Sequence, residues 1–379
     1  MNFELNEDRR LLSETLSRFL ADNYDIDKRH GFAMSDERFS REMWGRFAEL
    51  GMIGALFEES AGGFGGEGAD LMVVFEALGR HLVVEPFLPT LLAGSVLAKT
   101  GNHGDLLESV IGGEALLALA HGEPDSRYEL SKVSASAEAS GENWSISGDK
   151  AIVLGGGSAT HFVVSARTSG EPDDEDGISL FVVEKGEGVS LRGFGTIDGY
   201  GAAEIRLESA TGQLLGDLGG GYPLLEHGFS RGMTALCAET LGAMEVAKDL
   251  TVEYMHTRKQ FGVPIGKFQA LQHRMADVLI ELEQMRSAVI NAAGNLNADR
   301  LTREREVSAC KHLCGTIGRQ VAEEAIQIHG GMGMTWEYPV GHFAKRIIMA
   351  DHLLGDTDHH IERYIALGQT ASGNHNEHN

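Results

Sequence analysis

Apolar residues at the start of the chain recur with the period of an α-helix. Leu12, Leu16 and Leu20 are spaced four apart, which places them on one face of a helix. Farther along, Ser35 precedes a second periodic segment and is a candidate N-cap. Two apolar segments of the same kind follow. The pattern predicts an N-terminal helical domain over residues 1–113.

The pattern then changes to short runs of β-branched and aromatic residues. Residues 161–168 and 178–186 are such runs, and turn signals separate the strands about every ten residues. The polar stretch 169–177 is predicted to be a surface loop. Because no helical segment lies between these runs, residues 114–210 are predicted to form an antiparallel β-barrel or sandwich rather than a parallel sheet.

Helical periodicity returns in residues 222–368, which we expect to form a C-terminal four-helix bundle. The second long helix carries a single apolar stripe, made of Met275, Val278, Leu279, Leu282, Met285 and Val289. The polar tail 369–379 is predicted to be disordered. The fold class is therefore α+β, mostly α, with a helical domain on each side of a β-domain.

Composition excludes several classes of protein. The 379 residues include 32 Lys and Arg against 56 Asp and Glu, a formal net charge of −24. A nucleic-acid or anionic-membrane protein needs a basic face, so both are excluded as main partners. No apolar run approaches the ~20 residues of a membrane helix, and the charged N-terminus has no signal-peptide pattern. We expect a soluble, cytoplasmic protein.

The chain has only three cysteines, Cys237, Cys310 and Cys314, too few for a disulfide framework. Cys310 and Cys314 share a helix face with spacing suitable for a metal, but His312 between them points elsewhere. Ordinary helix packing explains the spacing better, so no metal site is predicted.

The stretch "TRKQFGVPIGKFQ" at 257–269 places two cations beside a Gln and a Phe, where a long helix is expected to end. These cations suit a helix C-terminus, whose macrodipole they complement for ~0.3–1 kcal/mol. They also suit a phosphate group, because the guanidinium of Arg258 is a planar, bidentate donor. A second stretch, "QIHGGMG", offers Gly330 and Gly331 as a helix C-cap or as a close approach to a ligand.

The order of helices, β-domain and helical bundle resembles the acyl-CoA dehydrogenase family over roughly residues 5–368. The resemblance rests on "RKQFGVPIGKFQALQHRMADV", on "QIHGGMGMTWEYPVGHFAKR" and on "WSISGDKAIVLGGGSATHFVVSART". Within the family the chain looks closest to the small subunits of pimeloyl-CoA dehydrogenases and related heteromeric enzymes. The resemblance implies FAD as cofactor and α,β-dehydrogenation of an acyl-CoA thioester.

The resemblance also implies site residues. Two parts of the helical bundle would contact an FAD held by a neighbouring subunit, and these cofactor-binding residues are Arg258, Gln260, Phe261, Gln269, Gln327, Gly330 and Gly331. Arg127 is a candidate for neutralising a substrate carboxylate or a CoA phosphate, although a surface position explains it as well. In the family, an electron-transferring flavoprotein accepts the electrons.

The chain departs from the family where the catalytic base is expected. Many members have a Glu before the last helix, where this chain reads "HLLGDTDHHIERY". One alignment puts Asp356 at that position and a second puts Gly355 there. Asp356 is the candidate base, with an N-cap of the last helix as the alternative. Other members carry the base on the first bundle helix, where this chain has Arg231 and Gly232.

The flavin-facing part of the β-domain departs too. Gly122 stands where the family has a Thr before Glu-Pro, and Ile152, Val153 and Leu154 stand where it often has Trp-Ile-Thr. Compared with the family pattern, the residues that would contact a neighbour's FAD are present in this chain, whereas those that would contact its own flavin are replaced.

Three hypotheses remain open. The first is an FAD-dependent acyl-CoA dehydrogenase, homotetrameric or heterotetrameric with a homologous subunit. The second is a non-catalytic partner that completes the FAD site of such a subunit. The third is a flavin oxidase or monooxygenase on the same fold.

Overall fold

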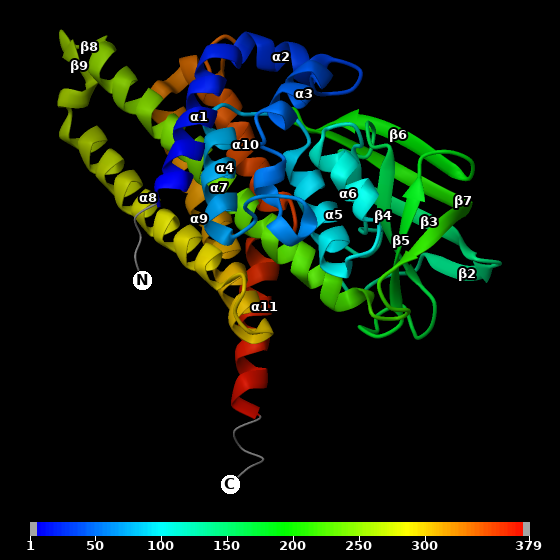
Figure 1. Ribbon diagram of the computed structural model, residues 1–379. Helices are drawn as coiled ribbons and strands as arrows, with labels where there is room; N and C mark the ends of the chain where they lie inside the picture. The colour runs from blue at the N-terminus through cyan, green and yellow to red at the C-terminus, as the bar shows by residue number, and fades with distance from the viewer. Residues whose placement is uncertain (1–5, 374–379) are drawn as a thin grey trace. The chain divides into compact units, whose positions relative to one another are not determined.

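The computed structural model describes residues 6–373, and the chain divides into two compact units that we treat separately (Figure 1). Unit 1 comprises Met1–Asp27, Gly68–Val83 and Met233–Asn379, and unit 2 comprises Lys28–Glu67 and Val84–Gly232. The predicted N-terminal helical domain is therefore shared between the units, because its first and fourth helices pack with the C-terminal helices.

Unit 1 is helical. Its elements are α1 (Glu7–Asn23), α4 (Gly68–Arg80), most of α7 (Gly221–Thr257), the short strands β8 (Lys259–Gln260) and β9 (Val263–Pro264), α8 (Gln269–Asn295), α9 (Arg300–His329), α10 (Val340–His352) and α11 (Thr357–Gly373). Two 3-10 turns, η3 (Ile265–Lys267) and η4 (Gly330–Met334), precede α8 and follow α9. The bundle predicted for the C-terminal region is present.

Helices α4 and α7 approach each other backbone to backbone. A Cβ at Gly79 would lie 1.8 Å from the Glu239 carbonyl oxygen, and one at Gly242 would lie 2.1 Å from that of Glu76. Only glycine fits at either position. The same stretch of α7 carries the Glu239 carboxylate, which forms a buried ion pair with Arg346 of α10.

Unit 2 combines the remaining helices with the β-domain. Its helices are α2 (Ile26–Met34), which begins just before the unit boundary, α3 (Arg41–Glu49), α5 (Phe87–Thr100) and α6 (Gly104–Ile111), with 3-10 turns η1 (Gly54–Leu56) and η2 (Glu59–Ala61). Its strands are β1 (Leu117–Ala120), β2 (Ser136–Ser140), β3 (Asn143–Leu154), β4 (His161–Arg167), β5 (Ile178–Glu184), β6 (Val189–Gly195) and β7 (Gly201–Leu215).

The strands pair in the order β1-β4-β2-β3-β7-β5, with β6 on β7 and an additional β4–β5 pairing. The β4–β5 pairing closes the sheet, as expected for a barrel or sandwich. The closed sheet surrounds a core that includes Phe162 and Phe181. The sheet is not wholly antiparallel as predicted, because β4 pairs in parallel with β1 and with β2. The connection from β1 to β2 is long enough to bring β2 alongside β4 without a helix.

Two further expectations need correction. Helix α11 continues to Gly373, so 369–373 are helical rather than disordered. The helix passes through Gly368 because a single glycine weakens a helix by only about 1 kcal/mol and no proline follows it; residues 374–379 lie outside the described residues. Leu279, placed on the core stripe of α8, is 46 % exposed, while the other five residues of that stripe are buried.

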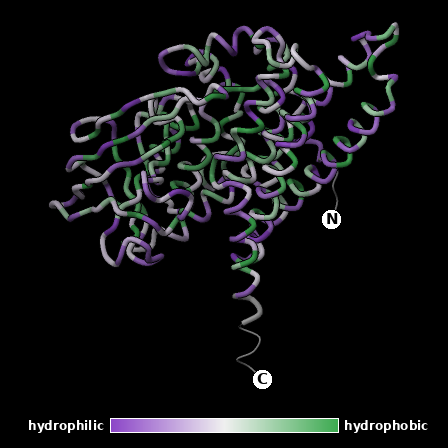
Figure 2. The backbone as a smooth tube through the Cα atoms, turned by 180° about the vertical axis from the view of Figure 1, so that it is seen from behind, coloured by the Kyte–Doolittle hydropathy of each residue, from purple (hydrophilic) through white to green (hydrophobic). Residues whose placement is uncertain are grey.

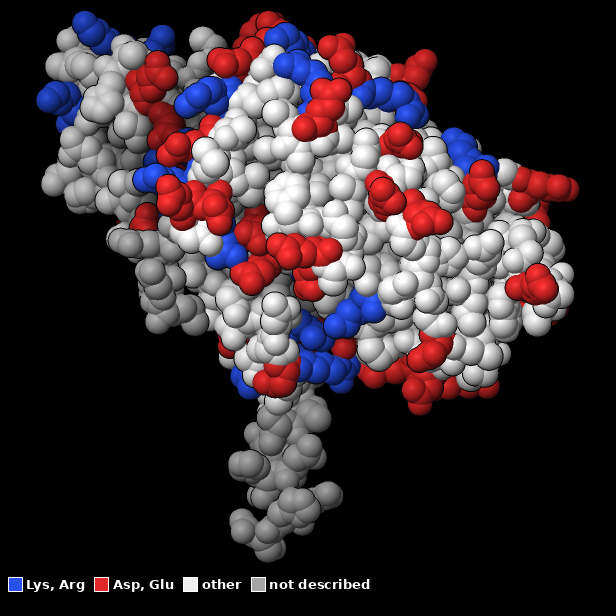
Figure 3. Space-filling model, in the orientation of Figure 1, with Lys and Arg blue, Asp and Glu red and all other residues white. Residues whose placement is uncertain are grey.

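None of the helices in residues 6–373 combines the length and the hydrophobicity that a membrane-spanning segment requires. Figure 2 shows hydrophobic and hydrophilic positions interleaved along the helices. Figure 3 shows acidic groups spread over the visible face with fewer basic ones between them, as the net charge implies.

Candidate active site

The corner predicted at the end of α7 is a short hairpin. Helix α7 ends at Thr257, and Lys259 and Gln260 pair with Pro264 and Val263. The backbone of Arg258 holds both ends of the hairpin: its N–H donates to Tyr254 O and its carbonyl accepts from the N–H of Ile265, each at 2.8 Å. In Figure 1 the hairpin lies where α7 ends and α8 begins.

The tip of the hairpin is strained and apolar. Phe261 has φ 53° and Gly262 has φ 83°, the two positive values that a two-residue hairpin turn requires. A bulky residue in the left-handed region is uncommon and costs on the order of 1–3 kcal/mol. The Phe261 side chain is nevertheless 91 % exposed. An exposed ring held at a strained turn indicates a binding role rather than a packing role.

The second predicted stretch lies beside the first. The ring of Tyr254, one turn before Arg258, is 4.5 Å from the ring of His329, which precedes Gly330. Gly330 caps α9 with φ 60°, and a Cβ built at Gly330 or Gly331 would meet nothing within 4 Å. The backbone of this diglycine is therefore open to a ligand beside the hairpin.

The predicted cofactor-binding residues thus fall in one region of unit 1. Arg258, Gln260 and Gln269 lie on the hairpin and at the start of α8, while Gln327 lies in the last turn of α9; all four are exposed. In the described part of the chain, their side chains form no hydrogen bond or ion pair with protein groups. A free guanidinium, three amides, an aromatic ring and an open diglycine fit an anionic dinucleotide.

Asp356, the candidate base, lies at the start of α11. Its Oδ1 accepts a hydrogen bond from the backbone N–H of His359 at 2.9 Å, and its carbonyl accepts from the N–H of His360 at 3.0 Å. This is the geometry of an N-cap. The carboxylate therefore has a structural task, and whether it also acts as a base stays a prediction.

Gly355, the alternative base position, has no room for a side chain. Its φ is 107°, and a Cβ there would lie 2.3 Å from Nε2 of His360. Two buried side chains hold this loop: Lys311 Nζ donates to Gly355 O at 2.6 Å and to Asp351 O at 3.1 Å, and His360 Nε2 donates to Leu354 O at 2.9 Å. Sequence reasoning missed both, since a Lys and a His within helices give no signal of burial.

The buried His360 predicts how the stability of the protein changes in acid. Burial, reinforced by the charge of Lys311, lowers the pKa of His360 to about 2. Because an unfolded His titrates near pH 6.5, the unfolded state alone takes up this proton on acidification. We expect the free energy of unfolding to fall below about pH 6.5, by about 2 kcal/mol at pH 5 from this group. Urea unfolding at pH 7.5 and 5.0 should show a smaller loss in His360→Gln, which keeps a donor for Leu354; an equal loss would contradict this assignment.

The second family position for a base, on the first turns of α7, is occupied by a cation. The Arg231 guanidinium is buried in unit 2 and donates to Ser95 Oγ at 2.9 Å, Gly66 O at 2.7 Å and Leu56 O at 2.9 Å. Its role there is to tie the loop 57–67 to α5 and α7. The side chain at this position cannot accept a proton.

In the β-domain, Glu123 is structural. Its carboxylate accepts from Lys150 Nζ at 2.7 Å and from the N–H groups of Ser134 and Ala135. Burial opposes its ionisation, but Lys150 and these donors hold the pKa of Glu123 below its usual value. His121 lies beside Lys150, and burial with that charge lowers the pKa of His121 to about 3.

At the sequence departure in β3, the register shifts between Lys150 and Val153. Ile152 has φ 54° and is 60 % exposed, whereas Val153 and Leu154 are buried. Only Ile152 of the triplet is thus presented outward, with neither an indole nor a hydroxyl. Arg127 lies in an exposed turn of unit 2 with φ 48°, so its substrate role stays a prediction.

The three cysteines are buried together in unit 1. Burial raises the pKa of Cys237, and contacts with Cys237 raise that of Cys314, so both are poor thiolates. His312 Nδ1 contacts Thr357 O at 3.1 Å instead of the thiols. Among the described residues, no group of three His, Cys, Asp or Glu side chains is placed to hold a metal ion.

Comparison with known proteins defines the class. Family models for the N-terminal, middle and C-terminal domains of acyl-CoA dehydrogenases match residues 6–104, 118–210 and 219–366. The chain therefore belongs to the acyl-CoA dehydrogenase family, as its sequence motifs predicted. This family consists of FAD-dependent oxidoreductases, so the predicted cofactor and enzyme class are confirmed.

Individual relatives are distant but cover most of the chain. The caffeyl-CoA reductase–Etf complex subunit CarC of Acetobacterium woodii is 29 % identical, over 80 % of this chain and 83 % of its own. A short-chain specific acyl-CoA dehydrogenase of Clostridium acetobutylicum is 27 % identical, over 90 % and 92 %. A solved variant of the Tcur3481–Tcur3483 steroid ACAD is 28 % identical with a TM-score of 0.88, over 97 % and 99 %.

Proposed function

We propose that this chain is one subunit of a heteromeric FAD-dependent acyl-CoA dehydrogenase, and that the catalytic base comes from a homologous subunit. The observation that carries the proposal is a contrast within the chain. The corner with Arg258 and Phe261 is exposed and open, whereas neither place where the family keeps its base offers an unengaged carboxylate. Asp356 caps α11 through its carboxylate. Gly355 has no space for a side chain, and Arg231 is a cation engaged by three oxygens.

The reaction removes two hydrogens from an acyl thioester. A carboxylate takes the α-proton, and the β-hydrogen leaves with its electron pair, so that an enoyl thioester forms. Bound FAD supplies the acceptor for that hydride. The part of this chain is to hold the cofactor: Arg258 would meet phosphate oxygens, Gln260 and Gln327 would hydrogen-bond, and Phe261 would cover the dinucleotide.

Two relatives support the finer assignments. The steroid ACAD is named by a pair of chains, which supports a heteromer and a sterol-derived thioester for this protein. The CarC protein belongs to a complex with Etf, which supports an electron-transferring flavoprotein as the redox partner of this protein. In the dehydrogenation direction that partner would accept the electrons.

Expression with and without a partner tests the proposal. The chain is produced alone and together with a homologous subunit from the same source that has a Glu before its last helix. We expect little FAD on the chain alone and no enoyl-CoA product, and a flavin spectrum with turnover after co-expression. One FAD per chain and acyl-CoA oxidation by the chain alone would overturn it.

Asp356 can be tested as cap and as base in the same assembly. Asn caps helices as well as Asp but cannot take a proton, whereas Ala can do neither. We expect Asp356→Asn to keep the turnover of the co-expressed enzyme within about two-fold, and Asp356→Ala to lose about 1 kcal/mol of stability. If Asp356 is the base, the Asn variant will fold normally and lose nearly all turnover.

A further inference from the structure

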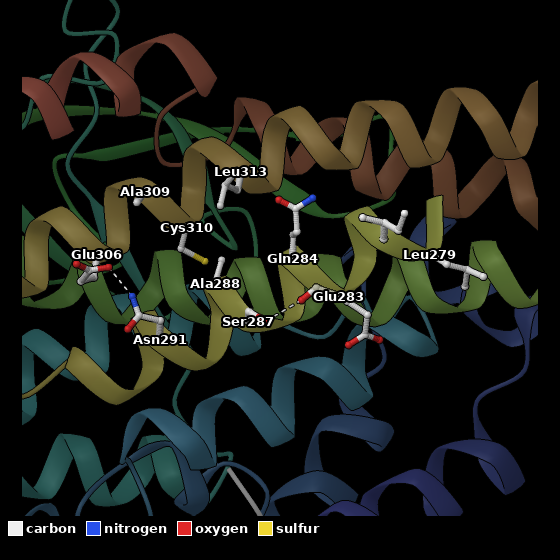
Figure 4. A pocket seen from close by; sticks show the side chains of 11 residues that line it. Leu279, Glu283, Gln284, Ser287, Ala288, Asn291, Glu306, Ala309, Cys310 and Leu313 are labelled. Atoms are coloured by element: carbon white, nitrogen blue, oxygen red, sulfur yellow. Dashed lines mark hydrogen bonds between the residues drawn. The ribbon is translucent and has the colours of Figure 1, made fainter. Parts of the chain in front are cut away.

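The candidate cofactor-binding residues lie on two exposed segments of unit 1, the hairpin and the diglycine. A pocket of about 890 Å³ is present between α8 and α9, and Figure 4 shows its lining from Leu279 to Glu306. Neither segment contributes to that lining. A ligand that bridges two exposed segments contacts both only when their separation is correct, so the groups that fix this separation control binding.

Three aromatic side chains join the two segments. Tyr254 lies in the last turn of α7, one turn before Arg258, while His329 is the last residue of α9 and directly precedes Gly330. Tyr338 lies just before α10. The ring centroids are 4.5 Å apart for Tyr254 and His329, 4.9 Å for His329 and Tyr338, and 6.2 Å for the two tyrosines. These separations are those of favourable aromatic pairs.

Hydrogen bonds fix the orientation of the His329 ring. Its Nδ1 lies 2.7 Å from the carbonyl oxygen of Ala325, which can only accept, so Nδ1 carries the proton. Its Nε2 lies 3.3 Å from the hydroxyl of Tyr338 and accepts from it. Burial lowers the pKa of His329, so the ring is neutral at pH 7. The ring is thus held by its own helix on one side and by the segment before α10 on the other.

The backbone passes this constraint to the hairpin and to the diglycine. The carbonyl of Tyr254 accepts from the N–H of Arg258, and the carbonyl of Arg258 accepts from the N–H of Ile265, each at 2.8 Å. The position of Tyr254 therefore sets that of the hairpin. On the other side, the N–H of Gly330 donates to carbonyls in the last turn of α9, the turn to which His329 belongs.

The contacts of Tyr254 come from its ring. Within the described residues its hydroxyl forms no hydrogen bond, and the side chain is only partly buried, as is that of Tyr338. A partly buried ring adds less to the core than a fully buried one. Its main effect is therefore local, at the place where the ends of α7 and α9 meet.

We infer that Tyr254, His329 and Tyr338 are positioning residues, which hold the hairpin and the diglycine at the separation that a dinucleotide requires before FAD binds. This inference rests on the proposed role of the two segments in binding FAD. A separation that is already fixed raises the affinity, because binding does not have to order the segments. The three side chains act through Arg258 and the diglycine and need not touch the cofactor.

Hydrogen exchange of the chain alone tests the inference without FAD. Tyr254→Ala removes the ring, whereas Tyr254→Phe keeps it. Tyr364→Ala is the matched control, because the ring of Tyr364 in α11 packs on Arg305 and lies away from the hairpin (Figure 1). We expect exchange at the amide of Ile265 to be about 10-fold faster in Tyr254→Ala and to stay within about two-fold of wild type in the other two variants. Wild-type exchange in Tyr254→Ala would overturn the inference.

Titration of the co-expressed apoenzyme with FAD supplies the second measurement. We expect Tyr254→Ala to weaken FAD binding about 10-fold and Tyr254→Phe to restore the wild-type affinity. Because Tyr254 acts through the position of Arg258, Tyr254→Ala should have a smaller effect when Arg258→Met is already present. An equal effect in both backgrounds would show that the ring does not act through Arg258 and would overturn the inference.

Tyr338→Phe keeps the test decisive if Tyr254→Ala does not fold. This variant retains the ring and loses only the donor to His329, and we expect it to weaken FAD binding about three-fold. Unchanged FAD affinity in Tyr338→Phe would overturn the inference and leave the heteromer standing. Acyl-CoA oxidation by the chain alone would instead overturn the proposed heteromer, and FAD titration of the chain would still test these three residues.

Discussion

Replacing Arg258 with Met is expected to weaken FAD binding by the co-expressed enzyme about 10- to 150-fold. This factor corresponds to the ~1.5–3 kcal/mol that hydrogen bonds to charged groups contribute. Arg258 directly follows α7, and its backbone is fixed by hydrogen bonds to Tyr254 and from Ile265. Because the backbone is already fixed, the Arg258 side chain loses less conformational entropy when its guanidinium binds a phosphate.

Lys259 provides the control for this prediction. It is the next residue and is also exposed, and its removal changes the net charge by the same amount. If the effect comes from a specific contact, Lys259→Met should change FAD affinity by less than about three-fold, since general charge attraction is screened by salt. Titration of the apoenzyme with FAD measures both affinities. If the two substitutions lower FAD affinity equally, Arg258 contributes only general charge attraction and makes no specific contact with the cofactor.

The architecture could be predicted because periodicity and composition change together along the chain. The long C-terminal helices have apolar positions at helical spacing and end at glycine, so the C-cap at Gly330 was predicted correctly. The start of α3 was not, because Ser35 and Ser40 are equally good caps by residue type. The structure uses Ser40, whose hydroxyl accepts from the N–H of Met43.

The parallel pairing of β4 with β1 and β2 could not be predicted from alternation. Alternation shows which side of a strand is buried but not which strand lies beside it. The exposure of Leu279 escaped prediction for a related reason. Its spacing fits the core stripe of α8, and only the packing of α8 against its neighbours decides that this residue stays exposed.

In the candidate site, too, some features could be predicted from local sequence and others depend on tertiary packing. The hairpin and the diglycine have local sequence signals and could be located from motifs. Lys311 and His360 hold the loop at Gly355 by hydrogen bonds. Lys311 is 44 residues away from Gly355 in sequence, and the sequence around His360 gives no sign that this side chain is buried. The packing of the helices places these side chains against the loop, and this packing is a property of the tertiary structure. For that reason the two alignments of the base could not be separated from sequence.

Substitution of Arg346 by Met is expected to lower the free energy of unfolding by about 3–5 kcal/mol, because the buried Glu239 carboxylate loses its ion pair. Arg346 and Glu239 are each 1 % exposed, and their ion pair joins α10 to α7. Arg346 also donates to the carbonyl of Val83 at 3.2 Å.

The double variant Arg346→Met/Glu239→Leu should recover most of this loss, since two apolar side chains can replace a buried ion pair at little cost. Urea unfolding of both variants measures the difference. Helix α10 precedes the loop that Lys311 and His360 hold, so the single variant should also loosen the start of α11, seen as faster hydrogen exchange at His359 and His360. A single variant as stable as the double variant would show that Glu239 finds another partner, and that the ion pair is not what joins these helices.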